Sequence, residues 1–402
     1  MSYVDGIVRW SDGGALADGA PAGCAAGDFP VVRYHLSRLA REIDRDIFAR
    51  GPASLWRYAP LLSAQYPENA VTLGEGWTPL VPMPRLGESI GCHRLWAKDE
   101  GRNPSGTFKD RGASVAVTRL RELDVKTVVH NSSGNAGGSW ALYAARAGLR
   151  CVNLLPTDAP PASLAQSLLA GADTMILDGP WQSSGAMVAK AATDEGWFNM
   201  GTLKEPHRVE GKKTMGLEIA EQLGWRLPDA IVYPTGGGVG AIAMYKAFRE
   251  LQALGWVKKG PLPKLLVTQY AGCAPIVRAF DAGADHAEVW TELDVLPGGL
   301  KSTRPPGDRA VLELLRETGG AAIAVSTAAA LRAVADVARH EGLFPCPEAA
   351  TTIAGLTQAF ARGTLDREAE IVVLLTGSGL KSVPQLPATG ACTVREGGRL
   401  SR

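Results

Sequence analysis

Residues 103–112 carry the strongest signal in the chain and read Asn103-Pro104-Ser105-Gly106-Thr107-Phe108-Lys109-Asp110-Arg111-Gly112. A turn-forming Asn-Pro-Ser-Gly run precedes Lys109, and a helical pattern follows it. A lysine amine is nucleophilic only where its ammonium form is destabilised, and a backbone position facing a cleft provides that setting. Lys109 is therefore a candidate for covalent chemistry. The alternative for this stretch alone is a surface lysine on the first turn of a helix.

A second run, residues 131–138, reads Asn-Ser-Ser-Gly-Asn-Ala-Gly-Gly. It lies between a strand expected at residues 126–130 and a helix expected at residues 136–147. Such a junction directs free backbone N–H groups and the positive end of the helix dipole at one point. That arrangement binds anions. An ordinary Ser/Asn helix cap is the alternative, but the nearby lysine run favours an anion site.

A third run, residues 234–240, reads Pro-Thr-Gly-Gly-Gly-Val-Gly and also separates an expected strand from an expected helix. Consecutive glycines let backbone amides close around a phosphate without obstruction by Cβ atoms. A Rossmann fingerprint requires a different glycine phase and an acidic residue about 20 positions further on. A P-loop requires a following Gly-Lys-Ser/Thr, which this run lacks. The run therefore predicts a phosphate cradle of another kind.

A fourth run, residues 374–381, reads Leu-Leu-Thr-Gly-Ser-Gly-Leu-Lys and follows the last strong strand, expected at residues 371–375. Together the four runs, in this order, resemble threonine synthase and its relatives in the fold type II (tryptophan synthase β) family of pyridoxal-phosphate enzymes. Residues 74–80, Gly-Glu-Gly-Trp-Thr-Pro-Leu, match the entry signature of the same family. The resemblance extends from Leu73 to Lys381.

The resemblance implies pyridoxal 5'-phosphate as the cofactor and assigns each site residue a role. The implied cofactor-binding residues are Lys109, Asn135, Thr235, Gly236, Gly237, Gly238, Val239, Gly240 and Thr376. The implied substrate-binding residues are Ser132, Ser133, Gly134, Ala136 and Arg208. Lys109 would be the catalytic Schiff-base lysine, Asn135 would contact the phenolic oxygen, and Thr376 would face the pyridine nitrogen. No metal ligand is implied.

The side chains of Thr376 and Arg208 have chemistry that suits the roles implied for them. A neutral hydroxyl at Thr376 would donate a hydrogen bond to the ring nitrogen without forcing full protonation, which tempers the electron sink. The planar fork of Arg208 suits a phosphate or carboxylate, since it donates two parallel hydrogen bonds. Its alternative is a surface salt bridge with a nearby glutamate. Lys212 and Lys213 are expected to be solvated charges, and Glu348 is expected in a cleft wall.

Composition sets the broad class. The chain has 402 residues, is 46% hydrophobic and carries a formal net charge of +1, so it can form two large domains and has no basic character typical of nucleic-acid binding. No apolar run approaches the roughly 20 residues of a membrane span, and the first residues do not resemble a secretory signal. Strands alternating with helices predict parallel sheets covered on both faces. We therefore expect a cytoplasmic α/β protein with no nucleic-acid or membrane partner.

The implied fold is that of a fold type II enzyme, with two parallel-sheet α/β domains and the cofactor in the cleft between them. We expect an N-terminal cap (residues 1–70), a large cofactor domain (71–112 and 209–385), a small substrate-carboxylate domain (113–208) and a C-terminal tail (386–402). A homodimer is expected by resemblance.

The implied activity is that of a carbon–oxygen lyase that converts O-phosphohomoserine and water into threonine and phosphate. Two departures leave an alternative open. Many threonine synthases have Thr-Ala-Ala where this chain has Ala136-Gly137-Gly138, and some relatives place Asn-Ser before the arginine where this chain has residues 202–205, Thr-Leu-Lys-Glu. The alternative is another β-elimination or β-replacement enzyme, such as a serine or threonine dehydratase or a cysteate synthase. A non-catalytic protein that binds pyridoxal phosphate or amino acids is a third hypothesis.

Overall fold

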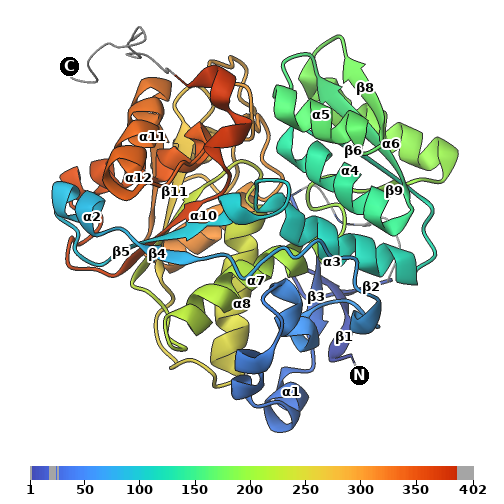
Figure 1. The fold of residues 1–402 in the computed structure, drawn as a ribbon, viewed down its shortest axis with the longest axis horizontal. Helices are drawn as coiled ribbons and strands as arrows, with labels where there is room; N and C mark the ends of the chain where they lie inside the picture. Colours follow the sequence, from blue (N-terminus) through green and yellow to red (C-terminus); the bar gives the residue numbers. More distant parts are fainter. Residues whose placement is uncertain (1, 18–23, 25–26, 387–402) are drawn as a thin grey trace, which may run out of the picture.

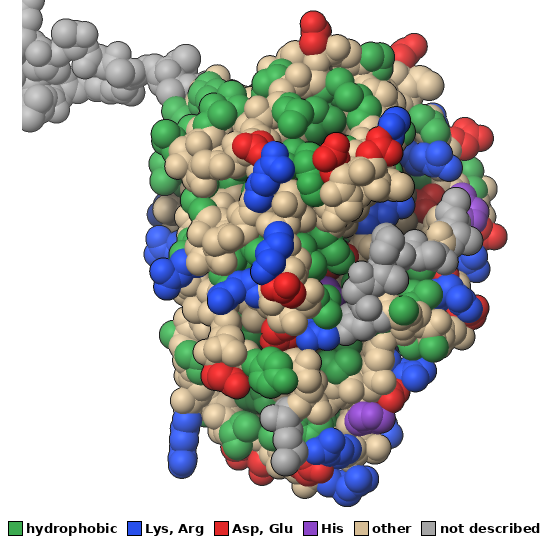
Figure 2. Space-filling model, turned by 90° about the vertical axis from the view of Figure 1, so that its right-hand side faces the viewer, with side chains coloured by type: hydrophobic (Ala, Val, Ile, Leu, Met, Phe, Trp, Pro, Cys, Tyr) green, Lys and Arg blue, Asp and Glu red, His purple; other side chains and the backbone are tan. Residues whose placement is uncertain are grey.

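The computed structural model describes residues 2–17, 24 and 27–386 and contains three β-sheets (Figure 1). The expected C-terminal tail, residues 386–402, lies outside the described residues except for Leu386. None of the helices in this described part is long and apolar enough to cross a membrane. Lys/Arg and Asp/Glu side chains are interspersed on the face shown in Figure 2.

The largest sheet has six strands in the order β12-β11-β10-β13-β5-β4. They are β4 (Leu80–Pro82), β5 (Leu95–Asp99), β10 (Ala230–Pro234), β11 (Lys264–Tyr270), β12 (Ala321–Val325) and β13 (Ile371–Leu375). Separate hydrophobic clusters cover the two faces: Ile231 and Tyr233 of β10 join one, while Ala230 and Val232 join the other. This double coverage confirms the predicted architecture. The antiparallel edge strand β4 was not expected, because three residues are too few to carry a periodic signal.

The smaller sheet has four parallel strands in the order β8-β7-β6-β9. They are β6 (Thr127–Asn131), β7 (Arg150–Pro156), β8 (Asp173–Leu177) and β9 (Phe198–Asn199). The helices of this region are α4 (Asn135–Ala147), α5 (Pro161–Leu169) and α6 (Ser184–Glu195). Figure 1 shows this unit in green beside the larger sheet. The sequence pattern predicts strands at residues 126–130, 150–155 and 173–177, which correspond to β6, β7 and β8; it does not predict the two-residue β9.

The other helices of the larger unit are α2 (Pro84–Ile90), α3 (Lys109–Glu122), α7 (His207–Gln222), α8 (Val239–Ala253), α9 (Pro275–Asp281), α10 (Asp308–Glu317), α11 (Thr327–Glu341) and α12 (Pro347–Ala361). The N-terminal region forms a small antiparallel sheet of β1 (Val4–Arg9), β2 (Ala15–Leu16) and β3 (Pro30–Tyr34), followed by α1 (Leu36–Glu42). Tyr34 attaches this sheet to α7, because its hydroxyl donates a 2.7 Å hydrogen bond to the buried Glu210.

Helices α3 and α7 cross in close backbone contact, and this crossing positions much of the site. A Cβ atom at Gly211 would lie 1.9 Å from the carbonyl oxygen of Arg111, and one at Gly112 would lie 2.8 Å from Arg208 Cγ. Only glycine fits at such a crossing. Helix α7 therefore runs through Gly211 and begins at His207, five residues earlier than the pattern of residues 212–223 predicts. As a result, Arg208 and Lys212 lie four residues apart on one helical face.

Candidate active site

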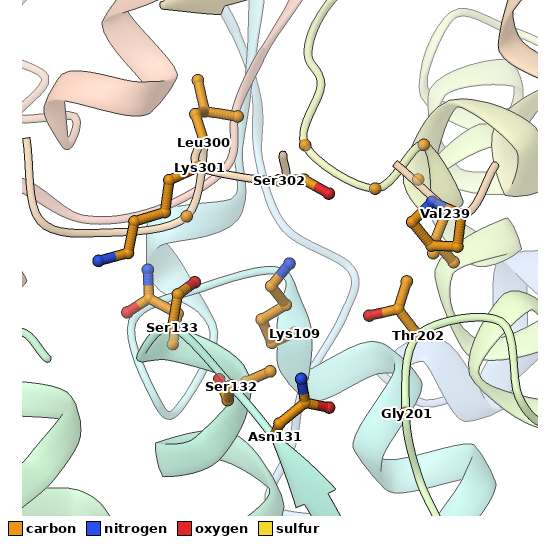
Figure 3. A pocket seen from close by; sticks show the side chains of 18 of the residues that line it. Lys109, Asn131, Ser132, Ser133, Gly201, Thr202, Val239, Leu300, Lys301 and Ser302 are labelled. Carbon is orange, nitrogen blue, oxygen red and sulfur yellow. The ribbon is translucent and has the colours of Figure 1, made fainter. Parts of the chain in front are cut away.

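A cavity of about 380 Å³ opens where the carboxyl ends of strands from the two parallel sheets meet. Ligands commonly bind at this place in open α/β sheets. Lys109, Ser132, Ser133, Thr202 and Val239 surround it in Figure 3. The predicted residues that line it are Lys109, Ser132, Ser133, Asn135, Ala136, Arg208, Gly236, Gly237, Gly238, Val239, Gly240 and Thr376. Runs that are far apart in the sequence therefore meet at one site.

Lys109 is the first residue of α3 and projects into this cavity (Figure 3). Its Nζ lies 4.2 Å from the centroid of the Phe108 ring. Burial lowers the pKa of Lys109 to about 8, and the nearby charge of Arg208 acts in the same direction, while Glu348 partly opposes the shift. A substantial fraction of the amine is thus neutral, and nucleophilic, near neutral pH.

The turn before Lys109 is fixed by the fourth run. Phe108 N donates to Thr376 O at 3.1 Å, and Ser378 N donates to Gly106 O at 2.9 Å. These bonds hold the start of α3 against the end of β13. Thr376 itself is 7% exposed and lines the cavity. The lysine and the residue predicted to face a ring nitrogen are thereby held in one rigid frame.

The run at residues 131–138 forms a tight loop at the start of α4. Gly134 has φ +148°, and a Cβ atom there would lie 2.7 Å from Pro160 Cδ. Ser132 Oγ accepts hydrogen bonds from Gly134 N (3.1 Å) and Gly137 N (2.9 Å), so its own hydroxyl hydrogen remains available to donate. Ser163 Oγ donates to Asn135 Oδ1 at 3.0 Å. Gly134 shapes this loop but does not itself line the cavity.

The glycine run at residues 236–240 lies at the start of α8 and has the geometry of an anion cradle. Helix α8 begins at Val239 and has no side-chain cap. A Cβ atom at Gly236 would lie 2.9 Å from Gly299 O, and one at Gly240 would lie 1.8 Å from Tyr233 Oη. Thr235 is fully buried and donates to Tyr233 O at 3.2 Å, so its side chain faces the backbone and does not line the cavity.

Arg208 is 5% exposed and is held by acceptors of the protein. Its guanidinium donates to Met200 O and, at 3.4 Å, to Thr202 Oγ1. Glu205 Oε1 lies 3.6 Å from Nε. Burial lowers the pKa of Arg208, and Glu205 opposes this effect. Arg208 is thus a cation of the cavity wall and not the partner of a surface salt bridge.

The structure adds residues that the sequence patterns did not assign to the site. Lys212 is 3% exposed and lines the cavity, so the expectation of a solvated charge is wrong. Lys213 is also buried, and it pairs with Glu210 at 2.6 Å and Glu250 at 2.8 Å. Their burial follows from the contact of α7 with α3 and α8, which a Lys-Lys pair in the sequence does not reveal.

Tyr233 and Glu348 are two further additions. Tyr233 Oη is buried and has no hydrogen-bond partner among the described residues. Glu348 was expected in a cleft wall, and it lines the cavity, where its Oε1 accepts a 2.9 Å hydrogen bond from Gly299 N. Its Oε2 is buried and finds no partner in the described part of the chain.

These features fit pyridoxal 5'-phosphate. The cofactor requires an amine for its aldehyde, a cradle for its phosphate and a partner for its ring nitrogen. The cavity offers the Lys109 amine, the glycine run at the uncapped start of α8, and the Thr376 hydroxyl. The unsatisfied Tyr233 hydroxyl beside Gly240 is a spare donor at the cradle.

Comparison with known proteins gives a consistent picture. Residues 71–377 match the family model described as pyridoxal-phosphate dependent enzyme. Threonine synthase of Methanosarcina acetivorans is 36% identical over 355 residues, covering 88% of this chain and 84% of the relative. Threonine synthase of Methanocaldococcus jannaschii is 33% identical, covering 89% and 88%. The fold is similar to that of threonine deaminase isoform 2 from Solanum lycopersicum, with a TM-score of 0.66, 18% identity and coverage of 92% of this chain and 100% of that chain.

Proposed function

The chain belongs to the family of pyridoxal-phosphate dependent enzymes, and on that premise we propose that it is a threonine synthase, a lyase that converts O-phosphohomoserine and water into threonine and phosphate. The observation that carries the proposal is the meeting of four runs from distant parts of the chain around one cationic cavity. The same runs define the resemblance to threonine synthases, and curated threonine synthases match most of the chain.

We assign the cofactor to the side of the cavity formed by the larger sheet. Lys109 would hold it covalently through its aldehyde, residues 236–240 would bind its phosphate, and Thr376 would face its ring nitrogen. When bound, pyridoxal 5'-phosphate supplies an electron sink that stabilises negative charge developing on the carbons of an amino-acid substrate. Asn135 lies on the wall formed by α4, where its amide group supports the predicted contact with the phenolic oxygen.

Lys109 is also the group best placed to move protons. Its pKa of about 8 lies near the working pH of a general base and a general acid, so Nζ can take the proton from the substrate α-carbon and return it. The amine lies 4.2 Å from the centroid of the Phe108 ring, an apolar neighbour that favours its neutral form. Lys109 would therefore serve both attachment of the cofactor and proton transfer.

The substrate is expected to lie between the two sheets. Its α-carboxylate fits the start of α4, where the Ser132 hydroxyl can donate and where Ser133 and Ala136 line the cavity, Ala136 in the first turn of the helix. Its phosphate fits the cationic wall on α7 that includes Arg208. The substrate is thus a small amino acid that carries a phosphate.

The glycines that follow Ala136 do not favour a different reaction. A Cβ atom at Gly137 would lie 2.9 Å from Leu155 Cδ2, and one at Gly138 would lie 2.5 Å from Gln166 Oε1. Packing against β7 and α5 therefore explains both glycines, and neither lines the cavity. Of residues 136–138, only Ala136 lines the cavity. Thr202 and Lys204, which belong to the second departure, also line it, so a dehydratase is the competing activity to be tested.

The decisive experiment incubates the purified, cofactor-loaded enzyme separately with O-phosphohomoserine, serine and threonine. Phosphate, threonine, ammonia and 2-oxo acid are quantified in each reaction. Equal amounts of phosphate and threonine from O-phosphohomoserine are expected. Ammonia and 2-oxo acid from serine or threonine, without phosphate release from O-phosphohomoserine, would establish the dehydratase instead.

We also propose that the enzyme is a cytoplasmic homodimer, which rests on the family resemblance. Size-exclusion chromatography with light scattering is expected to give twice the chain mass. A single-chain mass at micromolar concentration would contradict the dimer.

A further inference from the structure

The cavity has an excess of positive charge. Six cationic side chains line it, and Glu348 is the single carboxylate among the described residues of its wall. The cations are Lys109, Lys204, Arg208, Lys212, Lys301 and Arg304. A cavity of this composition concentrates anions and binds more than one negative group.

Most of these cations already have a partner in the protein, a role toward the cofactor or contact with solvent. Lys109 is reserved for the cofactor aldehyde, and Arg208 donates to protein acceptors. Lys301 pairs with Asp158 at 2.6 Å. Lys204 and Arg304 are exposed at the rim, where water solvates their charges.

Lys212 differs from all of them. It is 3% exposed, yet no carboxylate lies within salt-bridge distance of Nζ in the described ranges. Its Nζ lies 3.1 Å from the position that a Cβ atom would take at Gly112, and 5.6 Å from the centroid of the Phe108 ring. Burial lowers the pKa of Lys212 well below its usual value, and Arg208 and Lys109 add to the effect, while the charge of Glu205 partly opposes it. An unpaired buried lysine is unfavourable for folding unless a ligand compensates it.

The helix geometry directs Lys212 to the same place as Arg208. The two residues are four apart in α7 and therefore share one face, which packs on α3 beside Gly112. Around the Phe108 ring, Lys212 and the reactive Lys109 are neighbours. Lys212 thus shares a helical face with the arginine of the wall and lies beside the same ring as the amine at which chemistry would occur.

We propose that Lys212 binds the phosphate group of the substrate, and the released phosphate, as the second cation beside Arg208. This inference rests on the proposed function and deepens it. A phosphate dianion compensates two cations, whereas the neutral hydroxyl of serine or threonine leaves Lys212 unpaired in the cavity. Lys212 is therefore a specificity-determining residue that selects phosphorylated amino acids over hydroxy amino acids.

The phosphate of the cofactor is the other anion with the same chemistry. It has its own donors in the backbone amides at the start of α8 and in the spare Tyr233 hydroxyl. The proposal therefore assigns Lys212 to the substrate phosphate, and the experiment must measure both anions.

The test compares cofactor-loaded wild-type enzyme with Lys212→Gln and Lys212→Met, and with Lys258→Gln as a matched loss of one charge at an exposed position outside the cavity. Calorimetric titration gives the dissociation constant of inorganic phosphate. Cofactor affinity is measured separately, from the absorbance of cofactor-free protein titrated with pyridoxal 5'-phosphate. Both Lys212 variants are expected to weaken phosphate binding by about 10- to 100-fold and to change cofactor affinity by less than about threefold. Lys258→Gln is expected to change neither.

A second readout separates binding from a structural role. Without phosphate, Lys212→Met should unfold at the same or a higher temperature than wild type, because it removes an uncompensated buried charge. With phosphate, wild type should gain more thermal stability than the variant. A lower melting temperature of Lys212→Met without phosphate would indicate a structural lysine and overturn the proposal.

Two further outcomes also overturn it. One is equal phosphate affinity in wild type and both Lys212 variants, including the case in which wild type binds no phosphate. The other is a loss of cofactor affinity with phosphate affinity unchanged. The titrations decide the role of Lys212 whether or not O-phosphohomoserine is turned over, so failure here is distinguishable from failure of the proposed function.

Discussion

Two groups of charged side chains near the crossing of α3 and α7 have opposite environments. Behind the cavity, Arg111 pairs with Glu100 at 2.6 Å and with Glu218 at 2.5 Å, and Lys98 pairs with Glu218 at 2.6 Å. All four of these side chains are fully buried. In the cavity wall, Lys109 comes from α3 and Arg208 and Lys212 come from α7; among the described residues, Glu205, 3.6 Å from Arg208 Nε, is the one carboxylate within ion-pair distance of these three cations. The first group stabilises the crossing, and the second group is available to ligands.

The difference arises from helix geometry and not from residue type. Lys109 and Arg111 are two residues apart in α3, so they project about 200° apart around the helix. One therefore faces the cavity and the other the paired cluster. In α7, Glu218 lies on the paired side and Arg208 on the cavity side. Paired charges in the interior indicate structure, whereas unpaired charges in the interior indicate a ligand.

The largest effect is expected at Lys109. Lys109→Ala should reduce threonine formation by at least about 10⁴-fold, because one side chain provides both cofactor attachment and proton transfer. The melting temperature without cofactor should not fall, since the variant removes a buried cation that lacks a close partner. Product assays and thermal unfolding measure the two effects.

Borohydride trapping provides an independent check on Lys109. Reduction of the cofactor-loaded wild type followed by peptide mapping should place the label on Lys109. Label on Lys212, its neighbour at the Phe108 ring, would reverse the roles of the two lysines.

The sequence predicted the parts of this arrangement that are local. Four short runs predict a reactive lysine, a carboxylate loop, a phosphate cradle and a last strand end, because turn and glycine chemistry is encoded in consecutive residues. Their order along the chain is the order found in the family that the sequence resembles. The structure brings most of these residues to one cavity, while Thr235 and Gly134 support the loops behind it.

The sequence did not predict contacts made between distant helices. Lys212 and Lys213 read as a surface pair, yet α7 is enclosed by α3 and α8 and buries both. The pattern of residues 212–223 predicts a helix that begins at Lys212, whereas α7 begins at His207 and contains Gly211 as a close-contact position. The free hydroxyl of Tyr233 becomes visible only when Gly240 is placed beside it.

A substitution in the paired cluster should lower the stability of the fold, whereas Lys109→Ala in the cavity should not. Glu218→Ala leaves Arg111 and Lys98 short of a counter-charge in the interior, so the free energy of unfolding should fall by about 3–5 kcal/mol. Denaturant unfolding measures this change. Glu317→Ala is the matched control, because its ion pair with Arg249 is at the surface and should contribute no more than about 1 kcal/mol. A loss of under about 1 kcal/mol for Glu218→Ala would remove the distinction between the two groups.

The pH dependence of cofactor binding tests the environment of Lys109. The neutral amine is the reactive form, and the Lys109 pKa is about 8, so the rate of cofactor capture should rise about tenfold per pH unit below pH 8 and level off above it. Stopped-flow absorbance with cofactor-free enzyme measures the rate. Because Arg208 helps to lower this pKa, Arg208→Gln should move the plateau to higher pH. A rate still rising at pH 10 would show that Lys109 has an ordinary environment.

The smallest effect is expected at the rim of the cavity, where a substitution can remove the ion-pair partner of one cation, Lys301. Lys301, in the segment between α9 and α10, lines the cavity and pairs with Asp158, which follows β7 of the smaller sheet unit. The Asp158 side chain is 52% exposed, so Asp158→Asn should change the free energy of unfolding by less than about 1 kcal/mol. It frees Lys301 for an anion in the cavity, and phosphate affinity should therefore rise about two- to threefold at low salt and return to the wild-type value at high salt. Calorimetric titration at two salt concentrations measures this difference. If phosphate binding weakens instead, the Lys301–Asp158 ion pair acts by holding the two sides of the cavity together. This pair would then have a structural role, like the paired cluster around Arg111.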